Sequence, residues 1–130
     1  MITIAKQLAI FLDNRPGMLA RTCRALAKAK VNILAMSMHD TIDHTVVRLV
    51  VDKTPEAEQV CAGLHDLVQA RDVIFMDLDN RVGALAELAE RLAAAGINLE
   101  YAYCTTSPTH SAGAIVLRTN DLEATINTLS

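Results

Sequence analysis

The sequence predicts an α+β protein made of two ferredoxin-like (βαββαβ) modules, each an antiparallel sheet with helices on one face. The main observation is a repeat. Residues 13–38, DNRPGMLARTCRALAKAKVNILAMSM, recur 66 positions later as DNRVGALAELAERLAAAGINLEYAYC, with ten identities in 26 positions and no gap. The second observation is that each copy passes from helical spacing of apolar residues into a short hydrophobic run typical of a strand. A chain of 130 residues suits two such small units, which gain stability by packing together.

The first module is predicted over residues 1–71. It begins with an apolar strand over 5–12 that ends at an Asp-Asn-Arg turn. Pro16 suits the first position of the following helix, because its missing N–H would be unsatisfied there in any case, and Asp13 or Asn14 would cap that helix. The spacing and the β-branched runs then predict a helix over 16–30, a β-hairpin over 31–52 that turns at HDTIDHT, and a helix over 54–64.

The second module is predicted over residues 72–130, and one long strand over about 66–78 is shared by, or continuous between, the two modules. The elements that follow are a helix over 82–95, strands over 97–106 and 112–118, and a helix over 120–129. This module lacks a closing strand of its own. Because an unpaired edge of a hydrophobic sheet promotes association, we expect another strand, most plausibly from a second copy of the chain, to cover it. A homodimer is therefore predicted.

Composition excludes several functional classes. The net charge of −3 provides no electrostatic basis for binding nucleic acid. No stretch approaches the roughly 20 apolar residues of a membrane span, and the start of the chain has no cleavage signal, so we expect a cytoplasmic protein with no membrane partner. The cysteines Cys23, Cys61 and Cys104 form no C-x-x-C pair, and no metal or cofactor is expected.

The sequence does not predict an enzyme, and we assign no catalytic residue. Its five glycines form neither a G-x-G-x-x-G nor a P-loop motif, and G-x-S-x-G is absent. Asp77 and Asp79 lie at a strand end without a complementary acid or base nearby in the sequence. His39 and His44 have a spacing that matches no standard metal site.

The repeated turn is suited to a small zwitterion. The first N–H groups of a helix are unsatisfied and carry partial positive charge, so they attract a carboxylate, while asparagine amides offer donors and acceptors. The candidate ligand-binding residues are Asn14, Arg15, Gly17, Met18, Leu19 and Asn32 in the first copy and Asn80, Gly83, Ala84, Leu85 and Asn98 in the second. Alternatively, the first asparagine of each copy only caps a helix and the second only tolerates a turn conformation.

These motifs resemble the ACT domain, a ligand-binding regulatory module whose signature is a strand, D/E-N-R-P-G-x-L, a helix and a G-[IV]-N-I strand. DNRPGML with KVNIL matches it, and so does DNRVGAL with AGINLEYAY, except that Val82 replaces proline. The resemblance spans essentially the whole chain and implies a tandem ACT protein that binds an amino acid at interfaces between paired modules.

The resemblance also implies particular contacts. In the similar serine-binding module of phosphoglycerate dehydrogenase, a histidine before the turn and two asparagines hold the ligand. The two asparagines carry over to Asn14 and Asn32, and by the repeat to Asn80 and Asn98. The histidine position is Leu12 or Leu78 here, which indicates a more apolar contact than serine requires.

The function that the resemblance implies is that of an amino-acid-binding regulator or sensor without catalytic activity, for which a separate metabolic enzyme is a candidate partner. The alternative is a ligand-free dimerisation or assembly module that regulates a partner enzyme.

Overall fold

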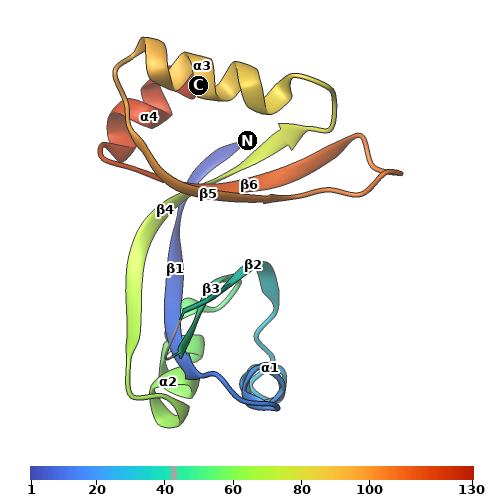
Figure 1. Ribbon diagram of the computed structural model, residues 1–130, viewed down its shortest axis with the longest axis vertical. Helices are drawn as coiled ribbons and strands as arrows, with labels where there is room; N and C mark the ends of the chain where they lie inside the picture. The colour runs from blue at the N-terminus through green and yellow to red at the C-terminus, as the bar shows by residue number, and fades with distance from the viewer. Residues whose placement is uncertain (42–43) are drawn as a thin grey trace. The chain divides into compact units, whose positions relative to one another are not determined.

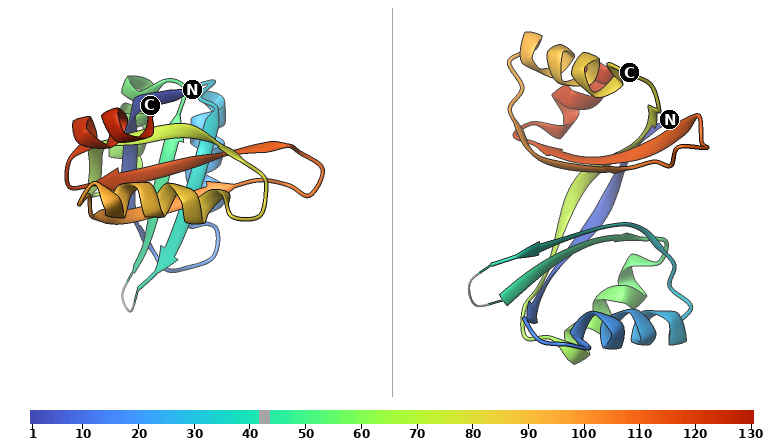
Figure 2. Two further views of the ribbon diagram at one scale, coloured as in Figure 1. Left: turned by 90° about the horizontal axis from the view of Figure 1, so that it is seen from above. Right: turned by 45° about the vertical axis from the view of Figure 1, so that its right-hand side comes forward.

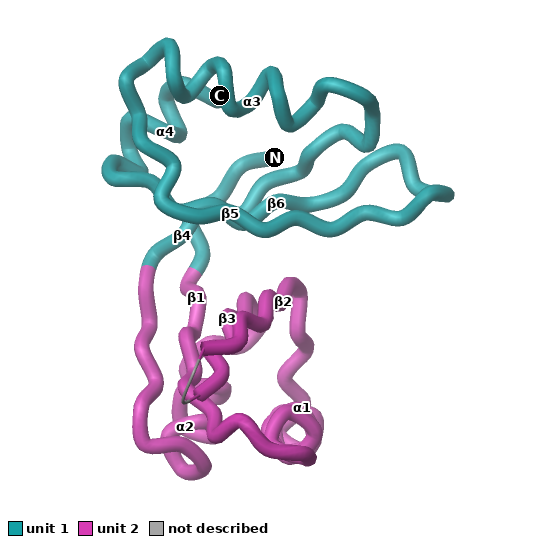
Figure 3. The backbone as a smooth tube through the Cα atoms, in the orientation of Figure 1, with its two compact units in different colours: residues 1–5, 72–130 teal, residues 6–71 magenta. Residues whose placement is uncertain are grey.

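The computed structural model of the protein describes residues 1–41 and 44–130, so Ile42 and Asp43 of the predicted HDTIDHT turn lie outside the described residues. The chain divides into two compact units (Figure 3). We call residues 6–71 the first module and residues 1–5 together with 72–130 the second module. The elements, in chain order, are β1 (Ile2–Asp13), α1 (Met18–Lys28), β2 (Ile33–Asp40), β3 (His44–Val51), α2 (Thr54–Leu64), β4 (Val68–Asp79), α3 (Ala84–Ala94), β5 (Leu99–Thr105), β6 (Ala112–Thr119) and α4 (Leu122–Leu129).

The first module has the strand order β2-β3-β1-β4, with α1 and α2 on one face of the sheet (Figure 1). Strands β1 and β3 are antiparallel, with Leu8 opposite Leu49. The side chains of Leu8 and Leu49 are fully buried, as is Leu26 of α1, and they belong to one core cluster between sheet and helices. Apolar residues at helical spacing on α1 thus meet the alternating apolar residues of the strands.

The second module repeats this plan. Its strand order is β1-β4-β6-β5, and α3 and α4 cover one face (Figure 2). Strands β4 and β6 are antiparallel, with Ile74 opposite Leu117, and both side chains are fully buried with Leu92 of α3 in a second core cluster. The predicted fold class, two ferredoxin-like modules with antiparallel sheets, is therefore confirmed.

The chain's own first residues close the sheet of the second module. The carbonyl of Met1 accepts a hydrogen bond from Asp77 N at 3.2 Å, and the hydroxyl of Thr3 donates to Phe75 O at 3.3 Å. The expectation that a second copy supplies this strand is therefore corrected. The physical reason is the length of β1. Its 12 residues allow the start of the strand to pair in the second module and the rest of the strand to pair in the first, whereas the sequence prediction began the strand at residue 5.

Helices α1 and α3 begin two residues later than predicted. Gly17 and Gly83 are their N-cap residues, each with φ of 88°, outside the helical region, so Pro16 and Val82 lie before the helices. A positive φ costs other L-residues roughly 1–2 kcal/mol, which explains why glycine stands at both positions. Neither helix has a side-chain cap, so the prediction that Asp13 or Asn14 caps α1 is wrong.

Among the described residues, no helix combines the length and the apolar character needed to span a membrane.

Candidate functional site

The first turns of α1 and α3 keep their N–H groups free of side-chain caps. Helix α4 is different, because Asp121 Oδ1 accepts a hydrogen bond from Ala124 N at 3.0 Å. At α1 and α3 the N-cap is a glycine, which has no side chain to accept such a bond. Both repeated turns therefore present the positive end of a helix dipole and N–H groups without side-chain acceptors, although at α3 the Ala84 N–H already donates to Arg81 O at 3.2 Å.

The turn of the second module borders a cavity of about 160 Å³ that gathers several predicted residues. Its lining includes Asn80, Ala84 and Leu85 of the turn and helix, together with Arg81 and with Thr105 at the end of β5. The cavity thus lies beside an uncapped helix N-terminus and an asparagine amide, both of which the sequence predicted for a ligand site.

Protein groups already orient the amide of Asn80. Its Nδ2 donates to Ser107 O at 3.0 Å and to His110 O at 2.7 Å, both in the hairpin between β5 and β6. With both amide hydrogens engaged, Asn80 Oδ1 is the remaining polar atom, and it can only accept. Asn14 is engaged in a similar way, because its Nδ2 donates to Asp40 Oδ1 at 2.9 Å.

The second asparagine of each repeat lies at the opposite end of the helix from the first. Helix α1 has 11 residues, which span about 16 Å, and it separates Asn14 from Asn32. The backbone N–H of Asn32 donates to Asp52 Oδ1 at 2.9 Å, and Asn98 N donates in the same way to Asn120 Oδ1 at 3.1 Å. A single small ligand cannot touch both asparagines of one module.

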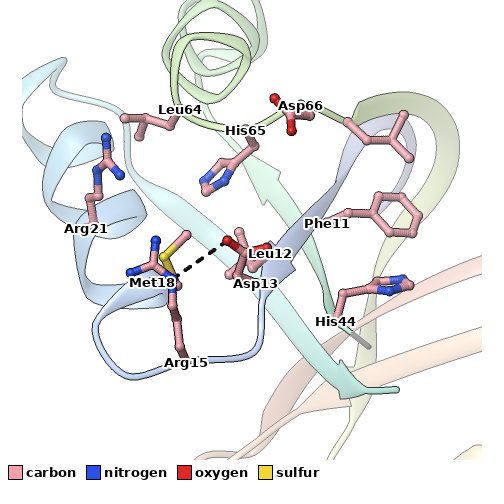
Figure 4. A pocket seen from close by; sticks show the side chains of 11 residues that line it. Phe11, Leu12, Asp13, Arg15, Met18, Arg21, His44, Leu64, His65 and Asp66 are labelled. Atoms are coloured by element: carbon pink, nitrogen blue, oxygen red, sulfur yellow. Dashed lines mark ion pairs between the residues drawn. The ribbon is translucent and has the colours of Figure 1, made fainter. Parts of the chain in front are cut away.

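Arg15 and Met18 border a different cavity of the first module, with a volume of about 280 Å³ (Figure 4). His65 is a member of its lining that sequence reasoning did not select, because it is isolated from the turn in sequence. Its side chain is 8% exposed. The Thr22 hydroxyl donates to Met18 O at 2.9 Å, so at the 2.8 Å contact it accepts from His65 Nε2, which identifies the neutral tautomer as Nε2–H.

Burial lowers the pKa of His65 from its usual value of 6.5, and nearby Arg21 lowers it further, while Asp13 and Asp66 act in the opposite direction. Between the lowered pKa and 6.5, the unfolded chain binds more protons at this residue than the folded chain. We therefore expect the free energy of unfolding to fall as the pH decreases below about 6.5. His65→Asn should remove this part of the pH dependence in urea denaturation, whereas the exposed His39→Asn should retain it; equal pH profiles for the two variants would contradict the assignment.

The Cys61 thiol is not an activated nucleophile. Burial raises the pKa of the Cys61 thiol to about 11, with Cys23 as a smaller cause, so Cys61 is protonated at neutral pH. Cys104 is exposed. Residues 1–41 and 44–130 contain no group of three or more His, Cys, Asp or Glu side chains placed to hold a metal ion.

Comparison with known proteins places these features in a family. A family model described as an ACT domain pair matches residues 2–129. A solved protein from Bacteroides thetaiotaomicron has 28% sequence identity and a TM-score of 0.88, covering 98% of this chain and 88% of that one. The ligand-free regulatory subunit of aspartate kinase from Thermus thermophilus has 14% identity and a TM-score of 0.71, with 98% and 93% covered, and shares the fold. No curated protein matches the chain significantly.

Proposed function

Because the chain belongs to the ACT domain family and consists of a pair of these domains, we propose that it is a cytoplasmic regulator that binds an amino acid and has no catalytic activity of its own. The observation that carries this proposal is the cavity at the second turn, where an uncapped helix N-terminus and an oriented asparagine oxygen lie together. These two groups have the polarity that recognises the two ends of a zwitterion.

The contacts of the proposed effector follow from the polarity of each group. Its carboxylate lies against the N–H groups that follow Ala84 in the first turn of α3, because the Ala84 N–H already donates to Arg81 O, and the helix dipole favours negative charge there. Its ammonium donates to Asn80 Oδ1, the acceptor left by the hydrogen bonds to Ser107 and His110. Leu85 and Ala84 supply apolar contact for the side chain. At the first turn, Asn14 and Leu19 occupy the equivalent positions.

Asn32 and Asn98 can contact the proposed effector only if it is bound at the turn of a neighbouring module. Because α1 separates Asn14 from Asn32, an effector that touches both must take one from each of two modules, and a homodimer supplies such pairs. Binding that favours one arrangement of the modules would transmit the effector concentration to a partner such as a separate metabolic enzyme.

A thermal-shift screen of the twenty amino acids tests the proposal. A ligand present at a hundred times its Kd stabilises the folded state by about 2.7 kcal/mol, so we expect at least one amino acid to raise the Tm. Asn80→Ala should abolish the response of the second site and Asn14→Ala that of the first. The exposed Asn127→Ala on α4 is the matched control and should respond as the parent does.

Two outcomes would count against this function. A Tm unchanged by all twenty amino acids would contradict it and favour the ligand-free assembly module. A full response in both asparagine variants would show that the effector binds elsewhere on the protein.

A further inference from the structure

The cavity of about 280 Å³ in the first module lies beside the turn, but Asn14 is not among its lining residues. It is lined by side chains from the end of β1, from α1 and from the segment 64–67 that leads into β4. Figure 4 shows Arg15, Arg21 and His65 bordering it from three separate segments. Its charged lining consists of these two arginines and of Asp13 and Asp66, whereas Phe11, Leu64 and Leu67 are among its apolar members.

The second module has a corresponding cavity of about 180 Å³. Six of its lining residues stand 66 positions after lining residues of the first cavity; these are Asp77, Leu78, Asp79, Arg81, Ala84 and Glu87, which correspond to Phe11, Leu12, Asp13, Arg15, Met18 and Arg21. The repeat therefore produces the same hollow twice, and the two copies can be compared residue by residue.

In the second module, the carboxylate of Glu87 already binds the guanidinium group of Arg81. Arg81 Nη1 donates to Glu87 Oε1 at 3.0 Å, and Nη2 donates to Oε2 at 2.6 Å, so the pair is bidentate. This hydrogen bonding lowers the pKa of Glu87. The Nε of Arg81 lies 3.5 Å from Asp79 Oδ2. The cavity of the second module thus contains both an arginine fork and the carboxylate that fills it.

In the first module, the arginine is retained but the carboxylate is not. Arg15 Nε lies 3.7 Å from Asp13 Oδ2, which corresponds to the 3.5 Å ion pair between Arg81 Nε and Asp79 Oδ2. The position of Glu87 is occupied by Arg21, a second guanidinium. Within the described residues, no acidic side chain binds the Nη1 and Nη2 atoms of Arg15 in the way that Glu87 binds those of Arg81. His65 and His44 complete the polar lining and supply no carboxylate.

We propose that the first module binds the carboxylate of a small organic acid between Arg15 and Arg21, at a site separate from the asparagine-bearing side of the turn. Glu87 is the built-in substitute for that ligand in the second module, so each chain binds one such carboxylate. The volume of about 280 Å³ lies just below the usual range of ligand cavities, which favours a small molecule.

The test is an NMR titration of the full chain with sodium acetate, which has a carboxylate but no ammonium, followed through the arginine Nε–Hε signals, with sodium chloride at equal ionic strength as the reference. We expect the signals of Arg15 and Arg21 to shift with saturation while that of Arg81 does not. In Glu87→Gln, which keeps the side-chain shape and removes the charge, Arg81 should also respond. A response from Arg81 in the unchanged protein, or none from Arg15 and Arg21, would overturn the proposal.

Charge variants on α1 separate a specific site from general attraction. Arg21→Glu, which copies the arrangement of the second module, should weaken acetate binding at least tenfold. Arg24→Glu makes the same change of charge one turn away, at an exposed position outside the cavity, and should leave binding unchanged. Equal losses in both variants would contradict the site, and saturable binding of phosphate without acetate would contradict its chemical class. Asn80→Ala should leave acetate binding at Arg15 and Arg21 unchanged. A failure of the proposed amino-acid site can therefore be distinguished from a failure of the proposed carboxylate site.

Discussion

Leu26→Ala is expected to lower the free energy of unfolding of the first module by about 2–5 kcal/mol, because it leaves a cavity in the hydrophobic core. The Leu26 side chain is fully buried and belongs to the cluster between α1 and the sheet. The repeat provides an internal comparison: Leu92 stands 66 positions later, is 1% exposed and belongs to the second cluster. Leu92→Ala should therefore have a loss of the same size in the second module.

Hydrogen exchange followed by mass spectrometry can assign each loss to its module. Leu26→Ala should accelerate exchange mainly in residues 6–71, and Leu92→Ala mainly in residues 1–5 and 72–130. Leu85→Ala on α3, where the parent side chain is 47% exposed, is the surface control and should change exchange little. Loss of protection through the whole chain in both core variants would show that the two modules unfold as one unit.

Met36→Asp is expected to raise the dissociation constant of the proposed homodimer about 30-fold. On β2, the edge strand of the first module, the apolar side chains of Leu34, Met36 and Met38 are 47%, 45% and 51% exposed, and Met36 and Met38 lie opposite Leu49 and Val47 of β3. Such an apolar stripe on a strand edge is a typical contact between copies. A charge at its centre should cost about 2 kcal/mol or more in association, roughly a 30-fold rise in Kd.

Light scattering coupled to size-exclusion chromatography measures this effect. Ala102→Asp is the matched control, because Ala102 is the exposed residue of β5 that stands 66 positions after Met36. It should remain a dimer. A parent protein that is monomeric at micromolar concentration would contradict the homodimer itself, and a Met36→Asp variant that keeps the dissociation constant of the parent would locate the interface elsewhere.

The elements were predictable because their signals are local. The second helix was expected over 54–64 and is Thr54–Leu64, and the long strand expected over 66–78 is Val68–Asp79. The helix starts were misplaced because the sequence shows that a residue is glycine but not that its φ is positive. The identity of Gly17 and Gly83 therefore indicated an open turn, and only the backbone showed that this turn delays the helix.

The candidate site divides in the same way. The types of group at the turn could be read from the sequence, since a glycine-led helix start and an asparagine each have defined donors and acceptors. The hydrogen-bond partners of the Asn80 amide could not be read from the sequence, because the carbonyls of Ser107 and His110 belong to the hairpin between β5 and β6. His65 was missed for a related reason: its partner, Thr22, lies 43 residues earlier in the chain.

The sequence by itself determined that this protein is a duplicated α+β unit with a glycine-containing turn before a helix in each copy, because periodicity and turn chemistry depend on neighbouring residues. Only the tertiary structure decided which groups meet. It placed Met1 and Thr3 against β4 to close the second sheet, brought the carbonyls of Ser107 and His110 to Asn80, and joined Arg81 to Glu87. These relations depend on the path of the chain in space, which local sequence patterns do not encode.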